Sequence, residues 1–129
     1  MANRNFDKPQ VLGKGVTLIA GNFAVDGASA VSAQVPTVEN AAPFVVTKPA
    51  GTGIYRITLQ DVYVAHYAVL CSVLKSAGAN VYKVDPCAAT ASTGVFDLQV
   101  HDSTTGNAVD PVTAEFEFLL VLKNSTVWP

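Results

Sequence analysis

Apolar residues recur in this chain with a period close to two, and the segments where they do so are rich in Val, Ile, Thr, Phe and Tyr. The clearest case is GTGIYRITLQD at residues 51–61, where one alternating set is Tyr55, Ile57 and Leu59. Successive side chains of a β-strand point to opposite faces, so this spacing predicts a strand. We expect it to lie in the centre of a sheet.

Shorter apolar segments precede this strand. Two alternating sets follow one another near the start of the chain, and they consist of Val16, Leu18 and Ala20 and then of Phe23 and Val25. They predict two strands or one bent strand before a turn at residues 26–27. The next segment ends near Pro36, which cannot donate to a backbone ladder and so favours an edge strand or a strand end. A further short apolar piece lies between Pro43 and Pro49.

The middle of the chain is more ambiguous. Residues 62–76 contain alanines and leucines that allow a helix, but also valines and tyrosines that favour a strand. We expect a short helical or irregular turn at 61–65 followed by a strand. A hairpin should follow, with its loop at 77–79 and a return strand that carries Val81, Tyr82 and Val84. In residues 95–101 we expect an inward set of Phe96, Leu98 and Val100 and an outward set of Asp97, Gln99 and His101.

The last strand, AEFEFLLVLKN at residues 114–124, has two unlike faces. One is apolar throughout and consists of Phe116, Phe118, Leu120 and Leu122. The other changes from charged to apolar midway and consists of Glu115, Glu117, Leu119 and Val121. We expect the apolar half of this second face to be covered by a second sheet of the same domain, by a sister subunit, or by both.

About seven or eight evenly spaced strands are typical of an all-β fold, either an antiparallel β-sandwich or a barrel-like domain, and not of βαβ units. The start of the chain is polar and lacks periodicity. We therefore expect an extended N-terminal arm at residues 1–14 and a single β domain at residues 15–129. The arm is locally basic through Arg4, Lys8 and Lys14, whereas the last third is acidic through Asp97, Asp102, Asp110, Glu115 and Glu117. A head-to-tail contact between copies and an ordinary solvated surface both account for this asymmetry.

Composition limits the classes of partner. Half of the 129 residues are hydrophobic and only 14% are charged, against about a quarter in typical soluble domains. Such a surface suits packing against neighbours. The net charge of -2 argues against a nucleic-acid partner, because such proteins usually carry a concentrated basic patch. The start lacks the apolar core of a signal peptide and no stretch is apolar for about 20 residues, so we expect a chain made in the cytosol with no membrane contact.

No combination of residues predicts an enzyme, a cofactor or a metal site. A zinc site needs four ligands at close paired spacings, whereas Cys71 and Cys87 stand far apart and are expected to be free, buried residues. His101, Asp102 and Ser103 are adjacent, but neighbouring side chains point in different directions, so we expect a surface turn and not a hydrolytic triad.

Two further sets of residues have alternative interpretations. Glu115 and Glu117 are of the type that acid–base catalysis uses, but solvated residues on an outward edge explain them more plainly. The four tyrosines would suit a sugar-binding surface, and they would equally suit a β core or an interface; they are Tyr55, Tyr63, Tyr67 and Tyr82.

Four segments resemble small virion proteins of tailed bacteriophages, namely MANRNF, GIYRITLQDVY, GVFDLQVHD and DPVTAEFEFLLVLKNSTV. The opening, the glycine-led strand ending in LQD-x-Y and the close DP…F-x-L-x-LKNS are similar to a group of phage structural proteins, most of all capsid decoration or cement proteins. The resemblance runs through most of the chain in order, whereas residues 24–52 match nothing in that group.

The resemblance implies a β-rich, non-enzymatic protein without a cofactor, which binds the capsid surface of the virion and stabilises contacts between capsomers. Its partners would be the major capsid protein and further copies of itself, in a dimer or trimer assembled in the host cytoplasm. For the contact we expect the arm residues Arg4, Phe6 and Lys8 and the large anchor Trp128, which can instead fold back over the core. A tail or fibre component and a carbohydrate-binding module on the virion are alternative hypotheses.

Overall fold

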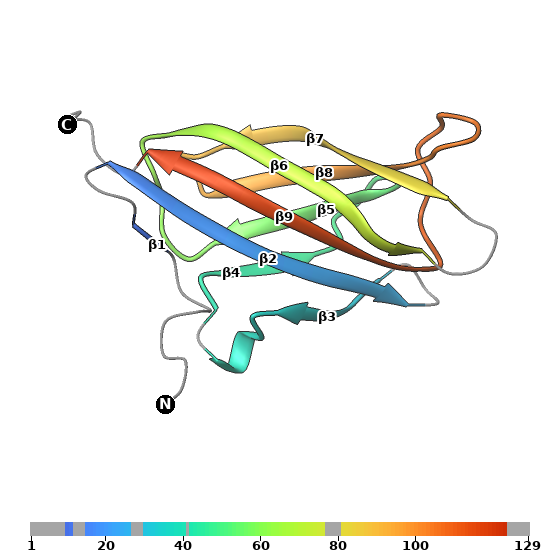
Figure 1. Ribbon diagram of the computed structural model, residues 1–129, viewed down its shortest axis with the longest axis horizontal. Helices are drawn as coiled ribbons and strands as arrows, with labels where there is room; N and C mark the ends of the chain where they lie inside the picture. The colour runs from blue at the N-terminus through green and yellow to red at the C-terminus, as the bar shows by residue number, and fades with distance from the viewer. Residues whose placement is uncertain (1–9, 12–14, 27–29, 41, 77–80, 124–129) are drawn as a thin grey trace.

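The structure, a computed structural model, describes residues 10–11, 15–26, 30–40, 42–76 and 81–123. Within these ranges the fold is all-β, with nine strands in two antiparallel sheets (Figure 1). The helical content of the same ranges is a three-residue 3₁₀ turn, η1 (Val38–Asn40), and no helix there is long and apolar enough to cross a membrane. The expected all-β fold is confirmed, and the two sheets form a β-sandwich that is not closed into a barrel.

The first sheet, sheet A, has five strands. Its order is β1 (Gln10–Val11), β2 (Val16–Asp26), β9 (Thr113–Lys123) and β6 (Ala65–Ser76), and β3 (Ala30–Val35) pairs with the second half of β2. β9 lies in the middle and pairs with β2 and β6 along its whole length. β1 is the strand beyond the expected seven or eight, and it lies within the segment that we expected to be an arm.

The second sheet, sheet B, has four strands in the order β4 (Phe44–Thr47), β5 (Ile54–Leu59), β8 (Val95–Asp102) and β7 (Tyr82–Thr90). β5 lies between β4 and β8, so its expected central position is confirmed. Its inward residues are Tyr55, Ile57 and Leu59, and those of β8 are Phe96, Leu98 and Val100, all buried as expected.

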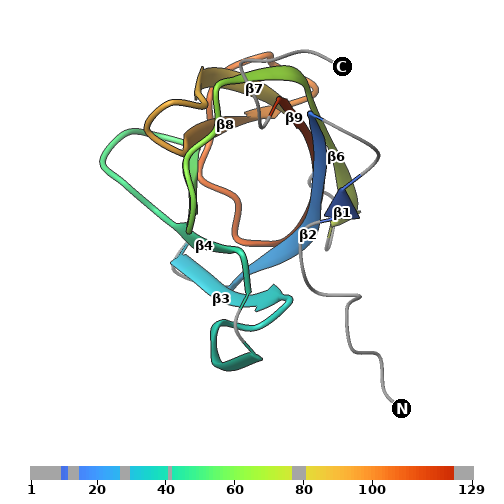
Figure 2. The ribbon, with the colours of Figure 1, turned by 90° about the vertical axis from the view of Figure 1, so that its left-hand side faces the viewer.

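The core lies between the sheets, with β4 and β8 on one side and β2 and β9 on the other (Figure 2). Phe23 of β2 is at its centre, because its ring centroid lies 5.4 Å from that of Tyr55, 5.3 Å from that of Phe116 and 6.5 Å from that of Phe118. Phe44 of β4 meets Phe118 edge-on at 5.0 Å. Each such aromatic pair stabilises a core by about 0.5–1.5 kcal/mol beyond the area it buries.

β2 is one continuous strand, whereas the sequence left open two strands or one bent strand. The buried residues Thr17, Ile19, Phe23 and Val25 all lie on its inner face. Alternation along a strand then turns the other set outward, so Val16, Leu18 and Ala20 do not belong to the face that carries Phe23. Gly21 occupies the inner position between Ile19 and Phe23, where the ring of Phe44 lies against it.

The expected hairpin between β6 and β7 is wrong. β6 pairs with β9 in sheet A, whereas β7 pairs with β8 in sheet B. In the described residues the two strands meet along one margin of the sandwich without a backbone ladder, and the Cys71 thiol donates to the Val84 carbonyl at 3.6 Å.

The expected loop at 77–79 lies outside the described residues. The irregular segment before β6 is confirmed, since β6 begins at Ala65.

Gln34 joins the two sheets along the opposite margin. Its side chain is buried between β3 and β4, where its Oε1 accepts from the Val46 N–H at 2.9 Å. Its Nε2 donates to the carbonyls of Phe44 at 3.0 Å and Pro36 at 2.9 Å. One side-chain amide therefore satisfies the outer backbone groups of β4, which would otherwise be buried without partners. β3 ends at Val35, directly before Pro36, as expected.

Gly21→Ala should destabilise the fold by about 1–3 kcal/mol, because an added Cβ would overlap the ring of Phe44 and come within 3.0 Å of that of Phe118. Chemical denaturation measures this loss. In a Phe44→Leu background the same substitution should cost less, since the smaller side chain leaves room. An equal cost in both backgrounds would show that the ring is not what excludes a side chain there. Ala24→Ser, on the outward face of β2, is the control and should change stability by less than about 0.5 kcal/mol.

Gln34→Leu should lower the free energy of unfolding by about 2–4 kcal/mol, because it leaves the Val46 N–H and the Phe44 carbonyl buried without partners. Gln34→Glu keeps an acceptor for Val46 but loses both donors, so it should also destabilise. Urea unfolding at neutral pH measures both. A Gln34→Leu variant as stable as the wild type would contradict the role of this amide as the link between the sheets.

Candidate interaction surface

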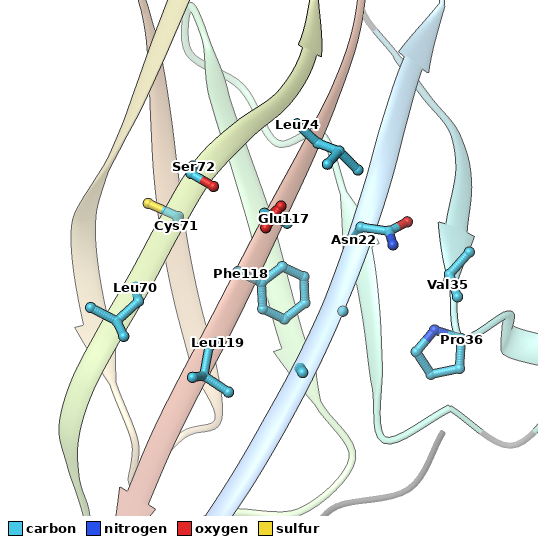
Figure 3. A pocket seen from close by; sticks show the side chains of 12 residues that line it. Asn22, Val35, Pro36, Leu70, Cys71, Ser72, Leu74, Glu117, Phe118 and Leu119 are labelled. Atoms are coloured by element: carbon cyan, nitrogen blue, oxygen red, sulfur yellow. The ribbon is translucent and has the colours of Figure 1, made fainter. Parts of the chain in front are cut away.

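The outer face of sheet A carries adjacent apolar residues on its three longest strands, and Figure 3 shows two of them, Leu119 of β9 and Leu70 of β6. Leu119 of β9 lies between Ala20 of β2 and Leu70 of β6 in the ladder, and Val121 lies between Leu18 and Ala68. We call these six residues the apolar face: Leu18, Ala20, Ala68, Leu70, Leu119 and Val121. The face follows from strand geometry, because the alternate residues of β9 and β2 are buried against sheet B.

The second sheet does not cover this surface, so that part of the expectation for Leu119 and Val121 is wrong. Sheet B packs on the opposite face of β9, against Phe116, Phe118, Leu120 and Leu122. Leu119 and Val121 are half-buried, Ala20 is exposed and Leu70 is 55% exposed. The second of the two expected covers, another subunit, remains a proposal. The alternation seen in β9 predicted two of the six residues; those on β2 and β6 became evident only from the register.

Charge flanks the apolar face at both ends of β9. Glu115 and Glu117 precede Leu119, and Lys123 follows Val121. All three charged residues are half-buried, and β9 is the central strand of sheet A and not the outward edge expected for the glutamates. Glu117 and Lys123 form no ion pair with any other described side chain. The outer face of the strand thus changes from acidic through apolar to basic.

A broad, open groove of about 830 Å³ lies at the acidic end of this surface (Figure 3). Leu70 and Leu119 line it together with Asn22, Ser72 and Glu117, and Leu74 at its rim is 52% exposed. The ionisable groups in its lining are Glu117 and Cys71. Burial, assisted by the charge of Asp85, raises the pKa of the Cys71 thiol to about 11, so it is not a thiolate nucleophile at neutral pH. The groove suits surface contact better than reaction chemistry.

Asp97, Asp102 and Asp110, which were expected to help make the last third acidic, accept hydrogen bonds from other described residues. Asp97 accepts from Arg56 in a bidentate pair, Nε to Oδ1 at 2.9 Å and a terminal nitrogen to Oδ2 at 3.1 Å. This pair raises the pKa of the Arg56 guanidinium. Asp102 accepts from the N–H groups of Thr104 and Thr105. Such local pairing favours an ordinary surface over a head-to-tail contact through these carboxylates.

Asp110, the third of these residues, fixes the turn before β5. Its Oδ1 accepts from the Gly53 N–H at 2.6 Å and lies 3.2 Å from Nζ of Lys48. The hydrogen bond from Gly53, supported by Lys48, lowers the pKa of the Asp110 carboxyl. Gly53 has a φ of 72°, and an added Cβ would come within 2.7 Å of the carbonyls of Val100 and Val109. The cluster holds two crossing segments together and is structural.

The four expected contact residues, Arg4, Phe6, Lys8 and Trp128, lie outside the described residues. The tyrosines do not gather on one surface, because Tyr55 and Tyr82 are buried in the core, Tyr63 is half-buried and Tyr67 is 50% exposed. Burial also raises the pKa of the Tyr55 and Tyr63 hydroxyls. The aromatic platform that a sugar-binding surface needs is therefore missing from these four residues.

The remaining expectations concern reactive residues. The expected surface turn holds for Ser103 alone, because His101 and Asp102 are the last residues of β8. The Ser103 hydroxyl donates to the Val81 carbonyl at 3.0 Å, while His101 faces Asp85. Both thiols are free, but Cys87 is exposed and Cys71 is half-buried, so their expected burial is wrong. The bulge between Pro86 and Ala88 accounts for the exposure of Cys87, because it interrupts the pairing of β7 at that residue.

The described ranges contain no group of three or more His, Cys, Asp or Glu side chains that could hold a metal ion. In comparisons with known proteins, no family model, no curated protein and no solved structure matches this chain. The apolar face and the sequence are therefore the two features of this chain that bear on its function.

Asp110→Ala should destabilise the protein by about 1 kcal/mol at neutral pH, a small value because the side chain is 44% exposed. The folded-state pKa of this carboxyl is depressed, so its contribution is present above its ordinary value of 3.8 and is lost as the pH falls below it. Urea unfolding of both proteins from about pH 7 to about pH 2.5 measures the difference, which should shrink with falling pH. A constant difference would show that the charge of Asp110 contributes nothing.

Proposed function

We propose that this protein is a non-enzymatic virion structural protein, which binds the outer surface of a phage capsid and stabilises contacts between capsomers. The observation that carries the proposal is the apolar face of sheet A, which the described part of the chain leaves partly exposed and which suits assembly with other subunits, on a sandwich with a closely packed core. Exposed apolar patches of a few hundred Å² on a monomeric protein are often functional surfaces. The resemblance of four sequence segments to decoration proteins supplies the choice of partner, the major capsid protein.

The bound protein would stabilise the shell by burying additional surface between itself and neighbouring capsomers. A protein that occupies many identical positions on a shell needs only a weak contact at each, because the contacts act together once the shell has assembled. Two features suit this role: the low share of charged residues, 14%, and an interaction surface carried on strands of a packed sheet, where little conformational entropy is lost on binding. On this proposal the protein is located on the capsid surface after assembly in the host cytoplasm.

The shell contact is proposed for the chain ends, through Arg4, Phe6, Lys8 and Trp128. A large aromatic anchor and a few cations are common centres of binding energy at interfaces. This leaves the apolar face of sheet A available for copies of the same chain. A tail or fibre position would use the same surfaces, so microscopy of the virion that locates the chain separates these two possibilities.

Purified capsids that lack the protein should open at a lower temperature than capsids to which it has been added back. Trp128→Ala should weaken binding to such shells by about 30-fold, the effect of losing a central interface anchor. Cosedimentation with the shells and scanning calorimetry measure the two effects, and Lys83→Glu, at an exposed site on β7, is a control that should leave both unchanged. Full occupancy without any change in shell stability would contradict the proposed role, and the absence of binding would contradict the capsid partner.

A further inference from the structure

The apolar face consists of two rows that complement one another. The ladder places Ala20, Leu119 and Leu70 in one row across β2, β9 and β6. The second row consists of Leu18, Val121 and Ala68. On β2 the small residue belongs to the first row, whereas on β6 it belongs to the second. If a second surface had the same two rows in the opposite order, each large side chain on β2 and β6 would lie opposite a small one.

We infer that the apolar face binds the same face of a second copy of this chain, with the β9 strands antiparallel about a two-fold axis. The axis lies in the plane of contact, at right angles to the strands, and passes next to Leu120, midway between the rows. This rotation places β2, β9 and β6 of one copy on the same strands of the other copy. The first row of each copy then lies on the second row of the other. Leu70 then faces Ala68 of the other copy, Leu18 faces Ala20, and Leu119 faces Val121.

The stacking tolerates the usual angle between packed sheets. Aligned sheets cross at about 30°, which displaces strands about 4.8 Å from the central strand by about 2.4 Å. Rows on one face of a strand are about 6.8 Å apart, so this displacement is less than half the spacing. The match of large to small residues therefore survives the crossing angle.

Charge selects the antiparallel orientation. Glu117 and Lys123 are six residues apart on the outer face of β9 and lie at equal distances on either side of Leu120. The two-fold axis therefore brings each Glu117 opposite Lys123 of the other copy, which gives one ion pair at each end. With parallel strands, Glu117 would face Glu117 and Lys123 would face Lys123, and such like-charge contacts are destabilising.

The area of the surface predicts a weak dimer. Three strands about 4.8 Å apart, each covering about 27 Å, offer at most about 400 Å² per copy, half of what a standard stable interface buries on each side. Association is therefore expected at micromolar or higher concentration. The inference concerns the purified chain alone and goes beyond the capsid proposal, because it requires no shell.

Sedimentation velocity on the full chain, at concentrations up to about 1 mM, tests the inference. The wild type should form dimers, and Leu70→Asp, at a site that is 55% exposed, should abolish them without changing the thermal unfolding of the monomer. Glu117→Lys and Lys123→Glu should each weaken dimerisation at least tenfold, since each places like charges together at both ends. The control Lys83→Glu makes the same charge change as Lys123→Glu, but on sheet B, and should have no effect on dimerisation.

A mixture of Glu117→Lys and Lys123→Glu chains is the decisive experiment, because the two variants restore opposite charges at both ends when they bind each other. The mixture should dimerise about as strongly as the wild type. A wild type that stays monomeric, a trimer, or dimers that Leu70→Asp does not affect would overturn the inference and assign the face to a different partner. Failure of the mixture to recover would overturn the antiparallel orientation. None of these outcomes depends on binding to a capsid.

Discussion

The packing of Phe23 and Phe116 in sheet A against Tyr55 in sheet B determines which face of sheet A lies inside. Once these rings are buried, alternation along each strand determines on which face of the sheet each remaining side chain lies. Gly21 is part of the same constraint, because the ring of Phe44 occupies the space where a side chain would stand. The apolar residues of β2 and β9 that do not belong to this core must therefore point away from it.

This consequence connects the core with the proposed function. A one-sided sheet would normally present polar residues outward, but the outer face of β9 presents Leu119 and Val121 between Glu117 and Lys123. The order of acid, apolar pair and base suits a surface that recognises its own reversed copy. A self-associating face and separate shell contacts at the chain ends would give a decoration protein both contacts that it needs.

The sequence predicted the all-β class, the inward faces of β5, β8 and β9, and the strand end before Pro36, because each depends on local alternation or on proline chemistry. It did not predict that β6 and β7 belong to different sheets, since pairing between distant strands is decided by the whole fold. The sequence also left open two strands or one bent strand around Gly21 and Asn22, whereas unbroken pairing with β9 makes β2 a single strand. The expected contact residues at the chain ends lie outside the described residues.

The most direct test of the account is the accessibility of the Leu and Val methyl groups to a dissolved paramagnetic probe, measured by NMR at low and high protein concentration. In dilute solution the methyl signals of Leu119 and Val121 should be strongly broadened, whereas those of Leu120 and Leu122, which are fully buried, should be protected. At high concentration the first pair should become protected as well. If Leu119 and Val121 are as protected as Leu120 in dilute solution, or stay equally accessible at every concentration, the account of this face is contradicted.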